Sequence, residues 1–342
     1  TDFINRFQED VQLMKLAGLT HYRTSINWSR FLTDYENVTV DEEYAAYYDQ
    51  LFDALLANGI TPMICLEHYE LPGYLLEKYG GWGSKTVVEL FVRYAEKVFA
   101  RYHPKVTRWF TFNEPIVVQT RVYLDALRWP YEQNTSTWMQ WNYHKVLATA
   151  CVVKRFRELG YPGTVGCILN PEVTYPRSRA PHDLRAAEIY DLFYNRMFLD
   201  PLVHGVWPPA LLALLEQHQV TWETSEEDLA VIREHTVDEL GINLYYPHRV
   251  KAPSRAWHPH TPFHPAWYYE PFELPGRRMN ASRGWEIYPQ IIFDMAMRIK
   301  NDYRNIPWFV AESGMGVENE GQFRNREGVI DDSYRIRFIS EH

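Results

Sequence analysis

Apolar runs with the composition of buried strands alternate with helical patterns along the whole chain, and this alternation is what most limits the fold. Six such runs occur, at residues 22–28, 60–66, 106–112, 164–168, 239–245 and 308–311. Regular alternation of strand and helix predicts a parallel sheet, because parallel neighbours need a long crossover connection. The sheet is then either doubly wound or closed into a barrel.

Helices are predicted from apolar residues at helical spacing and from their end signals. The expected helices cover residues 2–16, 41–56, 84–102, 143–159, 183–198, 210–218, 226–235 and 289–303. Asn58-Gly59 is a left-handed helix end. Thr224, with Glu227 three residues later, forms a capping box that predicts the start of the helix at 226.

Polar residues at the strand ends distinguish the two kinds of sheet. They follow almost every predicted strand, as Arg23 to Trp28, Glu67-His68, Asn113-Glu114, Asn170, Asn243 to Tyr246 and Glu312. A TIM barrel gathers functional groups at the carboxyl ends of many strands, whereas a doubly wound sheet uses one switch point with a glycine-rich turn. The chain contains neither GxGxxG nor a P-loop. The sequence therefore predicts a single (β/α)8-barrel catalytic domain over residues 1–342.

Charge and cysteine content limit the partners and the compartment. The net charge of −9 opposes nucleic-acid binding, which needs clustered Lys and Arg. No apolar run approaches the length of a membrane span. Three separated cysteines indicate reduced thiols and a cytoplasmic protein, although Asn-X-Ser/Thr sequons at Asn37, Asn134 and Asn280 argue weakly for export. Whether the protein forms a homo-oligomer is left open.

Two glutamates stand where a barrel presents its catalytic groups. Glu114 follows the strand at 106–112, and Pro115 favours an extended conformation at Glu114. Glu312 follows the strand at 308–311. Paired carboxylates on different strand ends support glycoside hydrolysis, in which one acid protonates the leaving oxygen and the other attacks or activates water. Taken singly, each glutamate is more simply explained as a solvated loop residue.

The motif context favours the catalytic interpretation. Residues 111–115 (TFNEP) and 310–314 (VAESG) resemble two motifs of glycoside hydrolase family 1, the second being its (V/T)ENG motif. Further matches occur in the family's order, at YRTSINWSR (22–30), LEHYELP (66–72), YGGW (79–82), GINLY (241–245) and GWEIYP (284–289). The resemblance spans nearly the whole chain.

This resemblance implies roles for individual residues. Glu114 would be the acid/base and Glu312 the nucleophile of a retaining double displacement, with carboxyl groups about 5–5.5 Å apart. His68 and Asn113 would contact the sugar, and Trp285 would provide an apolar platform for it. Arg23, Asn243 and Tyr245 would support the charged carboxylate of Glu312. The resemblance implies no cofactor and a small β-glycoside as the partner.

Two features depart from these motifs or compete with them. Ser313 stands where the family usually has Asn after the nucleophile, and we expect activity to survive this change. His258, His260 and His264 superficially suggest a metal site, but their Pro-rich loop offers no fixed element to hold ligands, so no metal is predicted.

The choice of sugar rests on two segments. His68-Tyr69-Glu70 is similar to the H(F/Y)E of 6-phospho-β-glucosidases rather than to the HWD of ordinary β-glucosidases, and residues 330–336 also resemble the phospho group. We favour a 6-phospho-β-glucosidase. The alternatives are a β-glucosidase or β-galactosidase for unphosphorylated glycosides and, from another class, a non-catalytic carbohydrate-binding relative. The six strands match the family's second to seventh, so the sequence predicts a barrel without its first and last strands.

Overall fold

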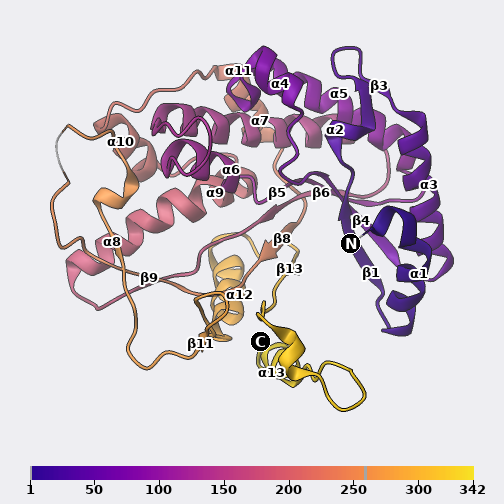
Figure 1. The fold of residues 1–342 in the computed structure, drawn as a ribbon. Helices are drawn as coiled ribbons and strands as arrows, with labels where there is room; N and C mark the ends of the chain where they lie inside the picture. The colour runs from indigo at the N-terminus through magenta and orange to yellow at the C-terminus, as the bar shows by residue number, and fades with distance from the viewer. Residues whose placement is uncertain (1, 258–259) are drawn as a thin grey trace. The chain divides into compact units, whose positions relative to one another are not determined.

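The computed structural model describes residues 2–257 and 260–342. The chain divides into two compact units, and each is built from several segments. The first contains Thr1–Leu169, Asp200–Val206 and Gln219–Gly241, and the second contains Asn170–Leu199, Trp207–His218 and Ile242–His342. Figure 1 follows the order of their elements along the chain. The expectation of a single barrel domain stays a prediction.

The first unit carries the first four predicted strands and the helices between them. Its main elements are α1 (Phe3–Leu16), β1 (His21–Ser25), α2 (Trp28–Phe31), α3 (Glu42–Ala57), β4 (Thr61–Glu67), α4 (Gly73–Tyr79), α5 (Lys85–Tyr102), β5 (Arg108–Asn113), α7 (Thr135–Leu159), β6 (Thr164–Leu169) and α11 (Glu226–Glu234). Shorter elements are β2 (Leu32–Asp34), β3 (Thr39–Val40), η1 (Gly81–Gly83), α6 (Val117–Gln119) and η2 (Thr120–Leu124). β8 (Leu240–Asn243) and α9 (Met197–His204) contribute residues to both units.

The strands of the first unit form a parallel sheet in the order β1-β4-β5-β6. Ser25 pairs with Cys65, Cys65 with Phe110, and Phe110 with Gly166, so one row of residues crosses all four strands. A side chain at Gly166 would lie 2.5 Å from the carbonyl oxygen of Glu239, so only glycine fits there. β4 and β5 are buried almost throughout, which explains why the sequence shows them as continuous apolar runs.

Aromatic packing beneath the carboxyl ends of these strands fixes their positions. Trp28, Trp82, Phe91 and Phe112 are essentially buried, and their ring centroids lie 4.9–6.0 Å apart in the contacts they make. The buried Tyr94 hydroxyl lies 3.2 Å from the carbonyl oxygen of Ile26 and 3.0 Å from that of Leu66, the two possible acceptors of its proton. This dense packing therefore holds the strand ends that carry site residues in fixed positions.

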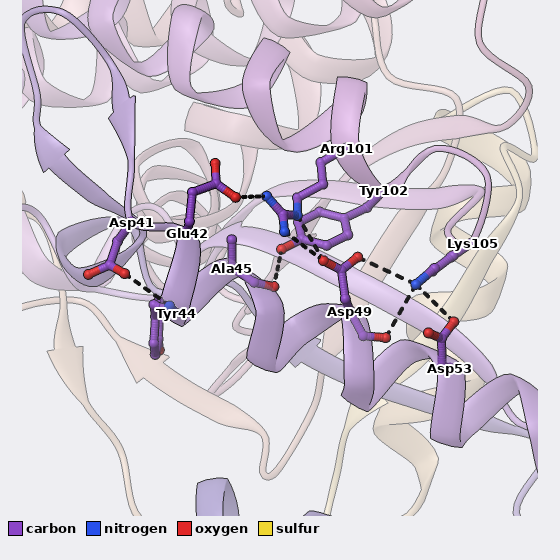
Figure 2. A network of polar contacts seen from close by, with 9 residues as sticks. All are labelled: Asp41, Glu42, Tyr44, Ala45, Asp49, Asp53, Arg101, Tyr102 and Lys105. Atoms are coloured by element: carbon purple, nitrogen blue, oxygen red, sulfur yellow. Dashed lines mark hydrogen bonds and ion pairs between the residues drawn. The ribbon is translucent and has the colours of Figure 1, made fainter.

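Ion pairs join α3 to the end of α5 on the outside of the first unit (Figure 2). Arg101 donates to Asp49 at 2.7 and 2.9 Å and to Glu42 at 2.6 Å. Lys105 pairs with Asp53 at 2.8 Å and with Asp49 at 3.4 Å. Asp41 caps α3 by accepting the backbone N–H of Tyr44. An opposite charge lies beside each member of these ion pairs, namely Arg101, Lys105, Glu42, Asp49 and Asp53.

The second unit carries the last strand and a set of short strands. Its elements are β7 (Thr174–Pro176), α8 (Pro181–Asp191), η3 (Leu192–Arg196), α10 (Pro209–Gln217), β9 (His248–Lys251), η4 (Pro265–Trp267), β10 (Glu270–Pro271), β11 (Met279–Asn280), β12 (Trp285–Glu286), α12 (Gln290–Asp302), β13 (Trp308–Glu312), η5 (Glu320–Phe323) and α13 (Ser333–Glu341). β9 pairs with β7 in parallel and with β10 in antiparallel orientation. Arg249, on β9, forms an ion pair with Glu286, on β12.

Three predictions about helices are wrong. Helix α11 is capped by Ser225, which accepts the N–H of Asp228, whereas Thr224 donates to Tyr143 instead. Helix α7 begins at Thr135 and not at 143, because Asn134 caps it by accepting the N–H of Thr137. The predicted helix at 183–198 is interrupted by a π-helical segment, η3. The six main strands are confirmed, and the short paired strands had no clear sequence signal.

None of the helices in the described parts of the chain combines the length and apolarity that a membrane span requires. The three cysteines are free thiols, as the sequence predicts. Two of the sequon asparagines have structural roles, because Asn134 caps α7 and the buried Asn280 donates to the carbonyl oxygen of Gly316. Neither observation bears on the compartment, which stays a prediction.

Candidate active site

Four of the predicted site residues lie at the strands of the first unit. Arg23 belongs to β1, His68 directly follows β4, Asn113 is the last residue of β5, and Glu114 follows it. The guanidinium of Arg23 donates to Asn113 Oδ1 at 3.1 Å. Asn113 Nδ2 lies 3.1 Å from His68 Nε2. The structure therefore connects three of the four through the buried amide of Asn113.

The hydrogen bonds of Asn113 determine which ring nitrogen of His68 carries the proton. Because Asn113 Oδ1 accepts from Arg23, its amide nitrogen is the donor toward His68, and Nε2 of the ring accepts. A neutral imidazole that accepts at Nε2 carries its proton on Nδ1. Asn113 is 1 % exposed, so this arrangement is shielded from competing water.

Glu114 does not have the extended conformation that Pro115 predicts. Its φ is +48°, in the left-handed region, where a residue with a side chain is strained. Its N–H donates to the carbonyl oxygen of Ile168 at 2.8 Å, and the carbonyl of Pro115 accepts from Lys145 at 3.1 Å and from Gln119. These bonds hold the backbone against the local preference, and strain of this kind concentrates at functional sites.

Tyr69 is a site residue to which the sequence assigned no role. Its hydroxyl donates a hydrogen bond to Glu114 Oε2. Tyr69 also has a left-handed backbone, with φ of +76°. Its ring meets that of His68 edge to face, with centroids 5.0 Å apart. The HYE segment was the available signal, but the sequence does not reveal where the hydroxyl lies.

A cavity of about 190 Å³ adjoins Tyr69 in the first unit. Its wall is mostly aromatic and aliphatic and is formed by Glu67, Tyr69, Leu71, Leu76, Trp82, Val118, Val122, Tyr123, Trp129, Pro130, Trp141 and Lys145. Glu67 and Lys145 are each 1 % exposed. Burial raises the pKa of Glu67 and lowers the pKa of Lys145, and the charge of each opposes that shift in the other.

Glu70 is a further, partly buried carboxyl group of this region. Burial, with the charge of Glu67 second, raises the pKa of Glu70 to about 7. Its Oε2 accepts the N–H of His68 at 3.0 Å. Within the described parts of the chain, Glu67 Oε2 and Glu70 Oε1 have no hydrogen-bond partner. The turn that carries His68 and Tyr69 is therefore stabilised by a carboxyl group that is costly to ionise.

The other predicted site residues belong to the second unit. Glu312 ends β13, and its carboxylate accepts the hydroxyl of Tyr245 at 2.5 Å. The backbone carbonyl of Glu312 accepts the N–H of Leu244 at 2.9 Å. Asn243, the last residue of β8, is 2 % exposed. The contact between Tyr245 and Glu312 is the one that the sequence predicts.

Trp285 lies in an aromatic group beside this carboxylate. Its ring centroid lies 5.2 Å from that of Tyr245 and 4.9 Å from that of Tyr246, which stacks on it. The guanidinium of Arg283 lies 4.7 Å from the Trp285 ring centroid. Rings arranged in this way offer apolar faces to a ligand. The role of Trp285 as a platform for the sugar stays a prediction.

Several site predictions concern residues from both units or residues outside the described part of the chain. The separation of Glu114 from Glu312 and the influence of Arg23 on Glu312 stay predictions. Ser313 is exposed, and its effect on activity also stays a prediction. Of the three loop histidines, His258 lies outside the described residues. His264 caps η4 by accepting the N–H of Ala266 through Nδ1.

Comparison with known proteins gives one consistent result. The model of "Glycosyl hydrolase family 1" matches residues 1–342. The chain is 40% identical over 342 residues to 6-phospho-beta-glucosidase GmuD of Bacillus subtilis, a match that covers 100% of this chain and 73% of the relative. It is 30% identical over 342 residues to beta-glucosidase A of Acetivibrio thermocellus, with coverage of 100% and 73%.

A solved structure shows the same similarity. The family 1 β-glucosidase from Thermotoga maritima matches with a TM-score of 0.87 at 27% identity, covering 100% of this chain and 73% of that one. Together with the parallel strand order, this likeness confirms the α/β TIM-barrel fold class expected from the sequence.

Proposed function

Because the chain belongs to glycosyl hydrolase family 1 and is thus a retaining β-glucoside hydrolase, we propose that its substrates are 6-phospho-β-glucosides. The observation that carries this choice is the 40% identity to a 6-phospho-β-glucosidase, against 30% to a β-glucosidase. The segment His68-Tyr69-Glu70 supports the same choice. A cytoplasmic location fits it, because a charged sugar phosphate does not cross a membrane unaided.

Glu114 and Glu312 divide the chemistry between them in this proposal. In the first step, the carboxylic acid of Glu114 gives its proton to the glycosidic oxygen while Glu312 attacks the anomeric carbon. The carbon–oxygen bond to the aglycone breaks, and a glycosyl ester of Glu312 forms. In the second step, the carboxylate of Glu114 takes a proton from water, whose oxygen attacks the anomeric carbon and releases Glu312.

The hydrogen bonds around each carboxyl group fit these roles. The Tyr245 hydroxyl donates to Glu312 and stabilises the anion that attacks. Arg23 and His68 hold the amide of Asn113, which is proposed to contact the sugar. Trp285, with the rings beside it, is proposed to support an apolar face of the substrate.

Four chromogenic substrates test the proposal. The full-length protein is assayed with 4-nitrophenyl 6-phospho-β-D-glucoside, with the unphosphorylated glucoside and with both galactosides. We expect kcat/KM to be at least about 100-fold higher for the phosphoglucoside, because a site built for a charged group rejects an analogue that lacks it. Higher kcat/KM for an unphosphorylated glycoside would contradict the phosphosugar assignment.

The same assay tests the alternative of a non-catalytic carbohydrate-binding relative. Absence of turnover of all four substrates, with binding detected by calorimetry, would support that alternative. The control is Glu312→Gln, which keeps the shape of the carboxylate but removes its charge and nucleophilicity. We expect this variant to lose turnover without a change in melting temperature.

A further inference from the structure

We propose that the Tyr69 hydroxyl is a positioning group for Glu114, holding its carboxyl group where it exchanges a proton with the leaving group and with water. The inference rests on the proposed role of Glu114 and adds a residue to it. Tyr69 would not react with the substrate; it acts through Glu114.

Backbone hydrogen bonds hold the main chain of Glu114, and a hydrogen bond from Tyr69 holds its carboxyl group. The N–H of Glu114 is bound to Ile168, and the next carbonyl, that of Pro115, accepts from both Lys145 and Gln119. These bonds act on the backbone and not on the side-chain torsions of Glu114. The hydroxyl of Tyr69 reaches Oε2 directly and selects one orientation of the carboxyl group.

The turn that carries Tyr69 is itself held in place. The carboxylate of Glu70 accepts the N–H of His68 at 3.0 Å, and the N–H of Leu71 donates to the carbonyl of Tyr69 at 3.2 Å. The φ of +76° at Tyr69 persists because these contacts outweigh its cost. Two left-handed residues, Tyr69 and Glu114, thus meet through one hydrogen bond between their side chains.

A purely structural role for the Tyr69 hydroxyl would not explain why it binds Glu114 in particular. Tyr69 as a whole is 37 % exposed, so burial of the residue does not by itself demand a hydrogen-bond partner in the protein. A neighbouring tyrosine offers the comparison, because the Tyr74 hydroxyl donates to Glu36 Oε1 at 2.8 Å and Tyr74 is 42 % exposed. Glu36 has further partners in Lys78 and Tyr79 and no predicted role in catalysis.

The test is Tyr69→Phe, with Tyr74→Phe as the matched control. Breaking the bond to a poor leaving group needs a proton from Glu114, whereas 2,4-dinitrophenolate departs without one. We expect Tyr69→Phe to lower kcat/KM about 10–100-fold for the phenyl 6-phospho-β-glucoside. For the dinitrophenyl glycoside, kcat/KM should change less than about threefold. Tyr74→Phe should leave both values unchanged.

Azide separates positioning from a general loss of structure. With the dinitrophenyl substrate, hydrolysis of the glycosyl ester needs Glu114 to deprotonate water. Azide attacks the anomeric carbon without giving up a proton, releases Glu312 and forms a β-glycosyl azide. We therefore expect azide to restore the kcat that Tyr69→Phe loses with this substrate, and to leave wild type and Tyr74→Phe unaffected.

A double-mutant comparison completes the test. In a Glu114→Ala background, Tyr69→Phe should cause no further loss, because the group that it positions is absent. Equal losses on both substrates, no azide rescue, or a full additional loss in the Glu114→Ala background would overturn the inference. Absence of wild-type turnover would instead contradict the proposed function.

Discussion

Two polar regions of the first unit differ in how their charges are satisfied. Between α3 and the end of α5, Arg101 and Lys105 are surrounded by Glu42, Asp49 and Asp53, and each carboxylate faces a cation at 2.6–3.4 Å (Figure 2). At the carboxyl ends of β4 and β5, by contrast, Glu67 and Glu70 each retain a carboxyl oxygen without a hydrogen-bond partner among the described residues.

The backbone shows the same difference. Tyr69 and Glu114, at the strand ends, adopt positive φ, whereas α3 and α5 are regular helices capped by Asp41 and Ser84. The outer network follows local rules and contributes modestly to stability, since its charges are partly exposed. The strand ends, by contrast, contain strained backbone and carboxyl oxygens without hydrogen-bond partners among the described residues. These features lower stability, and such a loss is consistent with a site selected for chemistry.

The largest expected effect concerns the buried charge pair. Lys145→Met should lower the free energy of unfolding by about 3 kcal/mol, because it leaves the carboxyl group of Glu67 buried without a nearby cation. The double variant Glu67→Gln/Lys145→Met should recover part of that loss. Urea denaturation at pH 7 measures both. Simple additivity of the two single losses would show that the pair is not coupled.

The next effect is a pH dependence from Glu70. Its pKa of about 7 in the folded state, against 4.5 ordinarily, corresponds to about 3 kcal/mol. The folded state holds the proton more tightly, so this contribution is favourable below pH 4.5 and is lost as the pH rises through 7. Glu70→Gln keeps an oxygen for the His68 N–H and removes the titration.

Urea denaturation at pH 5 and pH 8 measures this difference. Relative to wild type, Glu70→Gln should gain about 2–3 kcal/mol of unfolding free energy between the two pH values. Asp49→Asn, in the outer network, serves as the control for a paired and partly exposed carboxylate. An identical pH dependence in wild type and Glu70→Gln would contradict the view that Glu70 is costly to ionise.

The smallest effect belongs to the outer network. Arg101→Met should cost about 1 kcal/mol of unfolding free energy at low salt, because the ion pairs it removes are partly exposed. The loss should shrink in 1 M NaCl, where screening acts over about 3 Å. A loss above about 3 kcal/mol that does not change with salt would contradict this, because it would show that the outer ion pairs are as strongly coupled as the buried groups at the strand ends.

The sequence predicted the main strands for identifiable reasons, and it singled out Glu114 and Glu312 as the proposed catalytic pair. Buried parallel strands such as β4 and β5 appear as unbroken apolar runs, and Glu114 and Glu312 stand in recognisable motifs. Tyr245 was correctly expected to bind Glu312, because the family motif carries that contact.

The rest depended on contacts that local sequence does not encode. The rule for residues before proline failed at Glu114, since bonds from Lys145 and Gln119 to the Pro115 carbonyl override it. The Tyr69 hydroxyl was missed because a motif gives the residue type but not its rotamer. Ser225 and Thr224 are both good caps, and only the structure shows which one accepts the helix N–H.

Identification of the residue that carries the glycosyl ester is the most direct test of Glu312 as the nucleophile of a retaining mechanism. The protein is incubated with 2,4-dinitrophenyl 2-deoxy-2-fluoro-6-phospho-β-D-glucoside, whose fluorine slows hydrolysis of the ester, and peptides are then mapped by mass spectrometry. We expect one label per chain, on Glu312. A label on another residue, or turnover of the ordinary phosphoglucoside with inversion at the anomeric carbon, would contradict it.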